Sequence, residues 1–168
     1  MDALTFRRGL WFGISLAGVS MSHTFSSLLV HVTFSTKDRL PLIKAEMRER
    51  LFVYMNGVSR REFGTSPSIG GVEDHMHGLL ALPPDLPVSH AMNRWKSISS
   101  GWMRKQGVEN FAWQTGYAAF SVSASMADRV QRYIASQVQH HRRLTFKEEL
   151  VALLKRHRIT YDPERLWE

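Results

Sequence analysis

The stretch EDHMHGLLAL, residues 73–82, carries the pattern from which the fold can be predicted. Side chains alternate between the two faces of a β-strand, so a strand over residues 75–82 places His75 and His77 on the same face. Met76 and Leu80 then occupy the opposite face, which suits burial under a helix. The stretch therefore predicts a strand with one apolar face and one face that bears histidines.

Strands are also expected on both sides of this stretch. Residues 27–36 alternate between apolar side chains and polar ones that include His31 and Thr33. Shorter strands are expected over residues 67–72 and 117–123. Helical spacing of apolar residues predicts helices over residues 42–62, 88–105 and 125–141. A fourth helix is expected to begin at the capping box formed by Thr145 and Glu148.

The predicted order is β-α-β-β-α-β, followed by two helices. This is the split βαβ, ferredoxin-like order of an α+β protein: an antiparallel sheet with helices on one face, plus C-terminal helices. We expect residues 21–168 to form a single domain, because a length of 168 residues is ordinary for one domain. This fold hosts many functions, so the function has to be argued from particular side chains.

Residues 1–20 differ from the rest of the chain. Arg7 and Arg8 precede a mildly apolar run from Gly9 to Val19, which resembles a short signal peptide interrupted by glycine and serine. The run is shorter than the roughly 20 apolar residues that span a bilayer. We expect an N-terminal extension outside the fold, with Met21 as the functional start, and a cleaved signal peptide is the alternative. We also expect a cytoplasmic protein with no membrane segment.

The overall composition is that of a basic globular protein. Hydrophobic residues make up 43% and charged residues 22%, which argues against a disordered chain. There are 22 Lys and Arg against 15 Asp and Glu, a formal net charge of +7 that suits a polyanionic partner. The chain has no cysteine, which excludes disulfides, thiolate zinc sites and cysteine nucleophiles. Any metal site must therefore use nitrogen and oxygen ligands.

The face that bears histidines is a candidate metal site. Two imidazoles about 7 Å apart along one strand face can converge on a single divalent cation, and imidazole binds as the neutral base. Two ordinary half-exposed histidines are the alternative interpretation of His75 and His77. Strand alternation places Glu73, but not Asp74, on the same face, so Glu73 is a weak additional candidate.

A second polar group lies on the helix predicted over residues 125–141. Val138 belongs to its apolar core stripe, whereas Tyr133 and Gln137, four residues apart, share an adjoining stripe. If both face a cation above the histidine strand, Gln137 is a neutral third ligand and Tyr133 is a phenol beside a metal. Tyrosine is a poor nucleophile unless a charge or a base helps it to lose its proton. A tyrosine packed between helix and sheet is the alternative.

From Val30 to about Trp167, the chain resembles the single-tyrosine HUH transposases of insertion sequences, particularly the branch of REP-associated tyrosine transposases. Four segments carry the resemblance: HVTFSTKDR at 31–39, DHMH at 74–77, WQTGY at 113–117 and RYIASQ at 132–137. The resemblance maps the family's His-hydrophobic-His motif onto His75, Met76 and His77. It maps the nucleophilic tyrosine onto Tyr133 and the helix-borne third ligand onto Gln137.

The resemblance implies a metal-dependent endonuclease and strand transferase that acts on single-stranded DNA in transposition. In such enzymes the tyrosine attacks a phosphodiester, forms a 5′-phosphotyrosine link and leaves a free 3′-OH. The implied cofactor is Mg²⁺ or Mn²⁺, held by His75, His77 and Gln137, a neutral set that leaves positions open for phosphate oxygens. The implied partner is single-stranded DNA that bears a hairpin. A homodimer is a further expectation, with the tyrosine acting in cis or in trans.

Basic residues cluster beside the proposed nucleophile. From Arg129 to Arg158 there are eight Lys and Arg against two Glu, a net of +6. Such charges bind phosphates and position DNA without selecting a sequence, and aromatic side chains can stack on unpaired bases. The residues expected to contact DNA are Arg129, Arg132, His140, His141, Arg142, Arg143, Trp113, Tyr117 and Lys96.

Two other functions fit parts of this pattern. A catalytically silent DNA-binding relative would keep the fold and the charge, although the complete set of His75, His77, Tyr133 and Gln137 argues against it. A metal-dependent phosphoesterase for small molecules would use the histidines to activate water, although the basic helices suit nucleic acid better.

Overall fold

The computed structural model describes residues 24–164 and 166, so the extension expected over residues 1–20, and Met21, lie outside the described residues. Four antiparallel strands form one sheet: β1 (Leu28–Ser35), β2 (Ser68–Gly71), β3 (His75–Leu82) and β4 (Ala118–Val122). Their order across the sheet is β2-β3-β1-β4. This topology confirms the predicted α+β fold of the split βαβ type.

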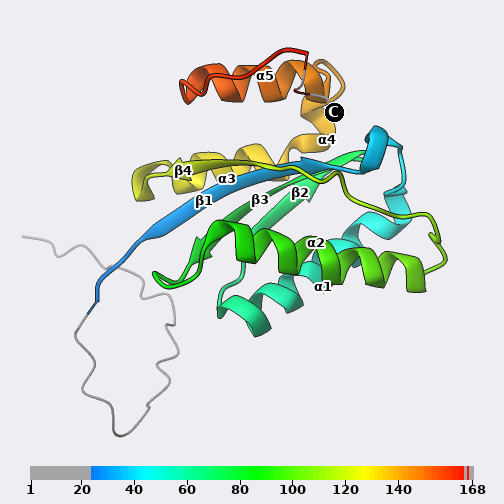
Figure 1. Ribbon diagram of the computed structural model, residues 1–168, viewed down its shortest axis with the longest axis horizontal. Coiled ribbons are helices and arrows are strands. Elements are labelled where there is room, and N and C mark those ends of the chain that lie inside the picture. The colour runs from blue at the N-terminus through cyan, green and yellow to red at the C-terminus, as the bar shows by residue number, and fades with distance from the viewer. Residues whose placement is uncertain (1–23, 165, 167–168) are drawn as a thin grey trace, which may run out of the picture.

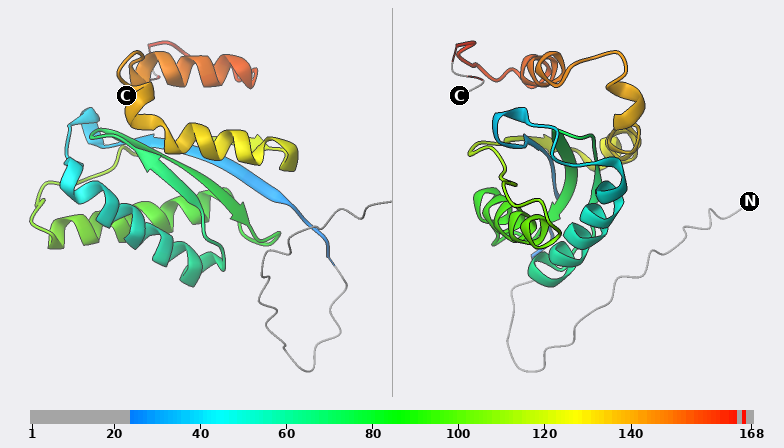
Figure 2. Two further views of the ribbon diagram at one scale, coloured as in Figure 1. Left: turned by 180° about the vertical axis from the view of Figure 1, so that it is seen from behind. Right: turned by 90° about the vertical axis from the view of Figure 1, so that its right-hand side faces the viewer.

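Helices cover both faces of the sheet (Figures 1 and 2). The helices α1 (Ala45–Phe63) and α2 (Val88–Lys105) lie side by side on one face, and α3 (Ala127–Ala135) packs against β2 and β3 on the other. The short α4 (Gln137–His140) leads to α5 (Phe146–Arg156), which lies on the same side as α3. Two short 3-10 helices, η1 (Lys37–Arg39) and η2 (Ala124–Met126), follow β1 and β4.

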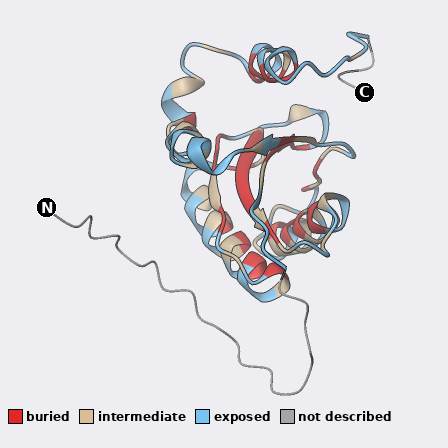
Figure 3. Cartoon of the chain, turned by 90° about the vertical axis from the view of Figure 1, so that its left-hand side faces the viewer, coloured by how far each residue is buried: buried red, intermediate tan, exposed pale blue. Residues whose placement is uncertain are grey.

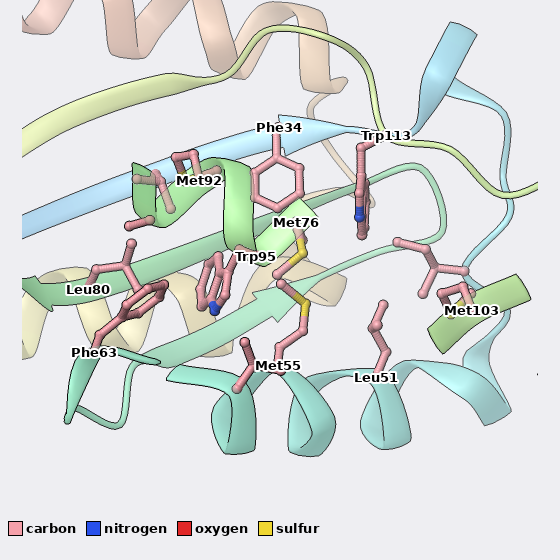
Figure 4. Packing of buried hydrophobic residues seen from close by; sticks show 14 of the residues in the cluster. Phe34, Leu51, Met55, Phe63, Met76, Leu80, Met92, Trp95, Met103 and Trp113 are labelled. Carbon is pink, nitrogen blue, oxygen red and sulfur yellow. The ribbon is translucent and has the colours of Figure 1, made fainter. Parts of the chain in front are cut away.

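The main hydrophobic core lies between the sheet and the layer of α1 and α2 (Figure 4). Phe34 of β1 and Met76 of β3 point into it beside Trp95 of α2, and all three are fully buried. The indole Nε1 of Trp95 donates to the hydroxyl of Ser59 in α1 at 2.6 Å, so its burial leaves no unpaired donor. The apolar face predicted for residues 75–82 is therefore confirmed.

A second layer covers the opposite face of the sheet. The apolar side of α5 packs on Phe120 of β4 through Phe146, Leu150, Leu153 and Leu154. The helix α3 approaches β2 closely at Gly70, where a Cβ atom would overlap the carbonyl oxygen of Ile134. Because both faces are covered, β3 is buried along almost its whole length (Figure 3). Within residues 24–164, no helix is long and apolar enough to cross a membrane.

The prediction of one continuous helix over residues 125–141 is wrong. The chain leaves helical geometry at Ser136 (φ −93°, ψ 11°), between α3 and α4. The hydroxyl of Ser136 donates to the carbonyl oxygen of Tyr133 at 3.0 Å, a local bond that competes with regular helix. The break leaves Val138, predicted as core, 48% exposed, and it carries His141 toward the sheet.

Candidate metal and tyrosine site

The face of the sheet beneath α3 and α5 carries the predicted histidines. In the register between β1 and β3, Thr33 pairs with His77 and Ser35 pairs with His75. The two imidazole rings lie 5.3 Å apart between centroids, and neither residue is more than 1% exposed. The two histidines therefore share one face, as predicted, and the interpretation of them as half-exposed surface residues is wrong.

Two further side chains reach the same point from the C-terminal segment. His141 follows α4, and Glu149 lies on the buried face of α5. The Oε2 atom of Glu149 lies 3.2 Å from Nε2 of His77, 3.2 Å from Nε2 of His141 and 3.6 Å from Nε2 of His75. The Nε2 atoms of His75 and His141 are 2.8 Å apart. Three imidazole nitrogens and one carboxylate oxygen thus converge, all within 4.8 Å of one another.

Each imidazole uses its other nitrogen to fix the orientation of the ring. The Nδ1 contacts are His75 with Asp74 Oδ1 at 2.7 Å, His77 with His31 Nε2 at 3.0 Å, and His141 with the Leu144 carbonyl oxygen at 2.8 Å. Since Asp74 and Leu144 offer only oxygen acceptors, Nδ1 of His75 and of His141 donates the proton. In a neutral ring this leaves the lone pair on Nε2, the arrangement found in metal-binding histidines.

These four residues fit a divalent cation. Ligand atoms about 2.1 Å from a common ion lie about 3.0–3.4 Å from one another in tetrahedral or octahedral geometry. The contact of His75 with His141 and the contacts of Glu149 with the three imidazoles, 2.8 to 3.6 Å, lie close to that spacing, and all four ligand atoms lie within 4.8 Å of one another. Within the described part of the chain, Glu149 Oε2 is a buried acceptor without a hydrogen bond of ordinary geometry, which a cation would satisfy.

The protonation states of the group suit the same purpose. Burial lowers the pKa of His75, which keeps this imidazole neutral near pH 7. Burial by itself would raise the pKa of Glu149, but the close imidazoles of His141 and His77 hold it well below its usual range. For His141, burial would lower the pKa, but the bond to Glu149 and its negative charge raise it. A buried, ionised carboxylate therefore sits among imidazoles.

Tyr133 meets the same carboxylate from α3. Its hydroxyl donates to Glu149 Oε1. Its ring packs edge-on against His31, His77 and His140, with centroids 5.3 to 5.9 Å apart. Burial, and after it the negative charge of Glu149, raises the pKa of Tyr133 well above the usual value. Tyr133 is therefore a neutral phenol. The carboxylate of Glu149 lies between it and the Nε2 atoms of His75, His77 and His141.

Gln137, the predicted third ligand, is buried at the same point with 1% exposure. Its Nε2 donates to Glu149 Oε1 at 3.3 Å and, more weakly, to the carbonyl oxygen of Tyr133 at 3.5 Å. Its Oε1 has no hydrogen-bond partner among residues 24–164 and 166. The structure thus brings Gln137 to the group, and its role as a ligand stays a prediction.

Several of the residues expected to bind DNA lie at the surface beside the site. The four arginines are exposed: Arg129, Arg132, Arg142 and Arg143. Two of them, Arg142 and Arg143, line a cavity of about 360 Å³ beside His75, and Arg129 lines one of about 500 Å³ beside Tyr133.

Two ring-bearing candidates also present surface to solvent. Tyr117 is 38% exposed. The side chain of His140 is 29% exposed and lines the cavity beside Tyr133. Their contacts with DNA, like those of the arginines, stay predictions.

The structure corrects the expectation for Trp113 and shows contacts of Lys96 within the protein. Trp113 is 8% exposed, packs edge-on against Phe34 and Phe111, and donates its Nε1 to Ser99 at 2.8 Å. With so little exposed surface, Trp113 belongs to the core. The ammonium of Lys96 donates to the carbonyl oxygens of residues 115 and 116 at 2.8 and 2.9 Å. Lys96 therefore holds this loop, and its contact with DNA stays a prediction.

Two further expectations are wrong for geometric reasons. His141 was expected to contact DNA, but its ring points inward and both of its nitrogens are engaged within the protein. Glu73 was expected on the histidine face, but its side chain is 58% exposed and lies 3.8 Å from Arg48. Asp74 contacts His75 instead. The strand begins at His75, so alternation does not extend back to the two acidic residues.

The sequence analysis missed Glu149, and one signal could have found it. Phe146, Leu150 and Leu153 form the apolar stripe of α5, and Glu149 is buried on that stripe. A carboxylate on an apolar helix face needs a partner, because an unpaired buried charge is strongly unfavourable. His31 was missed as well. It shares one face of β1 with Thr33, and Thr33 pairs with His77 in the neighbouring strand.

Comparisons with known proteins agree with this fold. Residues 24–137 match the family described as "Transposase IS200 like". A crystal structure assigned as a transposase from Deinococcus radiodurans R1 is 19% identical with a TM-score of 0.51, over 73% of this chain and 98% of that chain. A REP-associated tyrosine transposase bound to a REP hairpin is 15% identical with a TM-score of 0.53, over 74% of each chain. No curated protein is significantly similar.

Fold and family match together define a DNA transposase. The chain belongs to the IS200-like transposase family, whose match spans about two thirds of the 168 residues. The two solved structures, at their low identities, support the fold alone. The family match ends at Gln137, so His141 and Glu149 lie beyond it.

Proposed function

We propose that the protein is a metal-dependent single-stranded DNA endonuclease and strand transferase, acting in transposition through a 5′-phosphotyrosine intermediate. The observation that carries this proposal is the position of Glu149. One of its carboxylate oxygens accepts from the Tyr133 hydroxyl, and the other faces Nε2 of His75, His77 and His141. One phosphate group could therefore reach both. Because all these residues belong to one chain, we infer that Tyr133 acts in cis.

Tyr133 supplies the nucleophile in this mechanism. Its oxygen attacks the phosphorus of a phosphodiester, so that a Tyr–O–P bond forms and the bond from phosphorus to the 3′ oxygen breaks. The electron pair of the broken bond stays with the 3′ oxygen, which takes up a proton. The hydrogen bond to Glu149 orients the phenol, which loses one proton as the Tyr–O–P bond forms while the 3′ oxygen gains one, so the step is neutral in protons. Since one phosphate ester replaces another, the reverse reaction rejoins the strand without ATP.

His75, His77, His141 and Glu149 would hold the divalent cation, with the unpartnered Oε1 of Gln137 as a further donor. When bound, the cation supplies Lewis-acid stabilisation of the charge on the phosphate and on the leaving oxygen. The outer contacts of the histidines keep their Nε2 atoms directed at one point, so little reorganisation is needed when a substrate arrives.

Of the two predicted ions, the donor set favours Mn²⁺ over Mg²⁺. Magnesium prefers oxygen ligands in near-ideal octahedral geometry and keeps several waters, whereas imidazole suits transition metals. Three of the four converging ligand atoms are imidazole nitrogens. We therefore expect Mn²⁺ to bind this group more tightly than Mg²⁺.

Single-stranded DNA that bears a hairpin is the proposed substrate. A REP hairpin is the ligand of the structural neighbour that is a REP-associated tyrosine transposase. Exposed Arg129 lines the cavity beside Tyr133, and exposed Arg142 and Arg143 line the cavity beside His75, so positive charge lies close to the site. Affinity for such DNA should fall steeply as salt rises, because each phosphate contact releases counterions.

The experiment that tests this function looks for a covalent protein–DNA adduct. Labelled single-stranded oligonucleotides with several stem-loops are incubated with the protein and Mn²⁺, then resolved under denaturing conditions. We expect an adduct with the wild type and with Tyr54→Phe, a matched control in α1 on the opposite layer, but none with Tyr133→Phe. An adduct of full yield with Tyr133→Phe would remove Tyr133 as the nucleophile. Absence of an adduct on every substrate would favour a catalytically silent relative.

A further inference from the structure

A cavity of about 500 Å³ opens beside Tyr133, between β4, α3 and α5. Tyr133 and Glu149 form part of its wall, so the cavity is continuous with the candidate site. Pockets that hold small organic ligands run from about 300 to 1,000 Å³. The cavity therefore has room for a nucleotide.

The wall combines apolar and hydroxyl groups. Met126, Val130 and Leu153 offer apolar surface that can pack against the face of a base, and Met126 is 39% exposed. The hydroxyl groups of Ser121 and Ser123 can form hydrogen bonds with a base edge or a sugar. Apolar surface with a few polar groups is the usual composition of a site for a small organic group.

Two arginines add positive charge to the same wall. Arg129 comes from α3 and Arg156 from the last turn of α5, and both are exposed. Both guanidinium groups belong to residues that line the same cavity as Tyr133. Glu149 is the one carboxylate among the described residues that line the cavity. Charge complementarity therefore favours a ligand that carries phosphate.

We propose that this cavity binds the nucleotide on the 3′ side of the scissile phosphate, which is the nucleotide that stays joined to Tyr133. The inference rests on the proposed function, because the covalent intermediate defines that nucleotide. A single phosphate links it to the Tyr133 oxygen, so it must lie in space that Tyr133 itself lines. The ligand class is a deoxynucleoside joined through its 5′ phosphate, within single-stranded DNA.

The polarity of the strand follows from the direction of attack. In phosphoryl transfer the attacking and leaving oxygens stand roughly in line on opposite sides of phosphorus. The nucleotide that leaves with the 3′-OH is therefore directed away from Tyr133. The cavity is therefore assigned to the nucleotide on the 3′ side of the scissile phosphate and not to the one on its 5′ side.

Ala152→Trp is the variant that tests this assignment. Ala152 is exposed on α5 and lines the cavity, so a tryptophan there fills the space without removing any group of the site. Sequencing the DNA attached to the wild-type protein identifies the retained nucleotide. Affinity is then measured by fluorescence anisotropy with oligonucleotides that are intact or abasic at that position, in a Tyr133→Phe background that cannot cleave. The matched control, Ala45→Trp, lies on the exposed start of α1.

We expect Ala152→Trp to weaken the binding of intact DNA about tenfold, the order of magnitude of one lost base contact. The same substitution should change the binding of DNA that is abasic at the retained nucleotide by less than about twofold. Met126→Ala removes part of the apolar wall instead of filling the cavity. It should likewise weaken the binding of intact DNA more than the binding of abasic DNA.

Equal losses with intact and abasic DNA would overturn the proposal and leave Tyr133 as the nucleophile. The same holds if only an abasic position on the 5′ side of the scissile phosphate relieves the effect of Ala152→Trp. If the wild type forms no adduct on any substrate, the proposed function fails first and this inference fails with it.

Discussion

The hydroxyl of Tyr133 donates a hydrogen bond to Oε1 of Glu149, 16 positions further along the chain and on a different helix. The other oxygen of the same carboxylate faces the Nε2 atoms of His75, His77 and His141. One side chain of α5 thus links the proposed nucleophile to the proposed metal ligands. The C-terminal segment is part of the site and not an appendage to the family domain.

Glu149→Gln keeps the size of the side chain and removes its charge. We expect the affinity for Mn²⁺, measured by isothermal titration calorimetry, to fall by at least about tenfold, because an anionic ligand is lost. The neighbouring substitution Glu148→Gln affects the capping box at the surface and should leave Mn²⁺ affinity within about twofold. Unchanged Mn²⁺ affinity in Glu149→Gln would show that Glu149 is not a ligand.

His141→Ala distinguishes a metal ligand from a DNA contact. The imidazole of His141 lies in the group, whereas that of His140 lies outside it and approaches only the other oxygen of Glu149, with Nε2 3.3 Å from Oε1. We expect His141→Ala to weaken Mn²⁺ binding by about tenfold or more and His140→Ala to leave it nearly unchanged. The measurement is competition with a chromophoric chelator in the absence of DNA. A larger loss of Mn²⁺ binding in His140→Ala than in His141→Ala would contradict this assignment.

Gly70→Ala tests the close approach of α3 to the sheet. A Cβ atom at Gly70 would overlap the carbonyl oxygen of Ile134, so α3 must shift, and Tyr133 with it. We expect the free energy of unfolding, measured by urea denaturation, to fall by about 1–3 kcal/mol. The yield of covalent adduct should fall as well.

Gly57→Ala is the control for that substitution. Gly57 lies in α1 with nothing within 4 Å of the added Cβ. Its replacement should raise the free energy of unfolding by up to about 1 kcal/mol, because alanine is the better helix former. Equal stability of Gly70→Ala and the wild type would contradict the close packing of α3.

The free energy of unfolding is expected to depend on pH through Lys96. Burial lowers the pKa of Lys96 from 10.5 to about 8. Between these two values the unfolded chain binds more protons at this residue than the folded chain, so its contribution to stability rises with pH. The free energy of unfolding of the wild type, relative to Lys96→Met, should therefore increase from pH 8 to pH 10.5. A difference that stays constant across this range would contradict the burial of the charged group.

The fold and the strand histidines could be predicted because their signals are local. Alternation over residues 75–82 defines a strand, and two histidines at alternate positions share a face whatever lies above them. Glu149 could not be assigned, because its partners depend on how α5 lies over the sheet. Trp113 was misjudged for the same reason: it forms an isolated bridge with Thr36, a contact distant in sequence that turns a loop residue into core.

The contact between His75 and His141 spans 66 positions of the chain. A cation held there would close a long loop and act as a reversible cross-link between the sheet and the C-terminal segment. Its effect on unfolding would then depend on the concentration of free metal, since binding stabilises the folded state in proportion to the logarithm of ligand concentration over its dissociation constant. A chelator that removes the cation would then break this link between the sheet and the segment that contains α4 and α5.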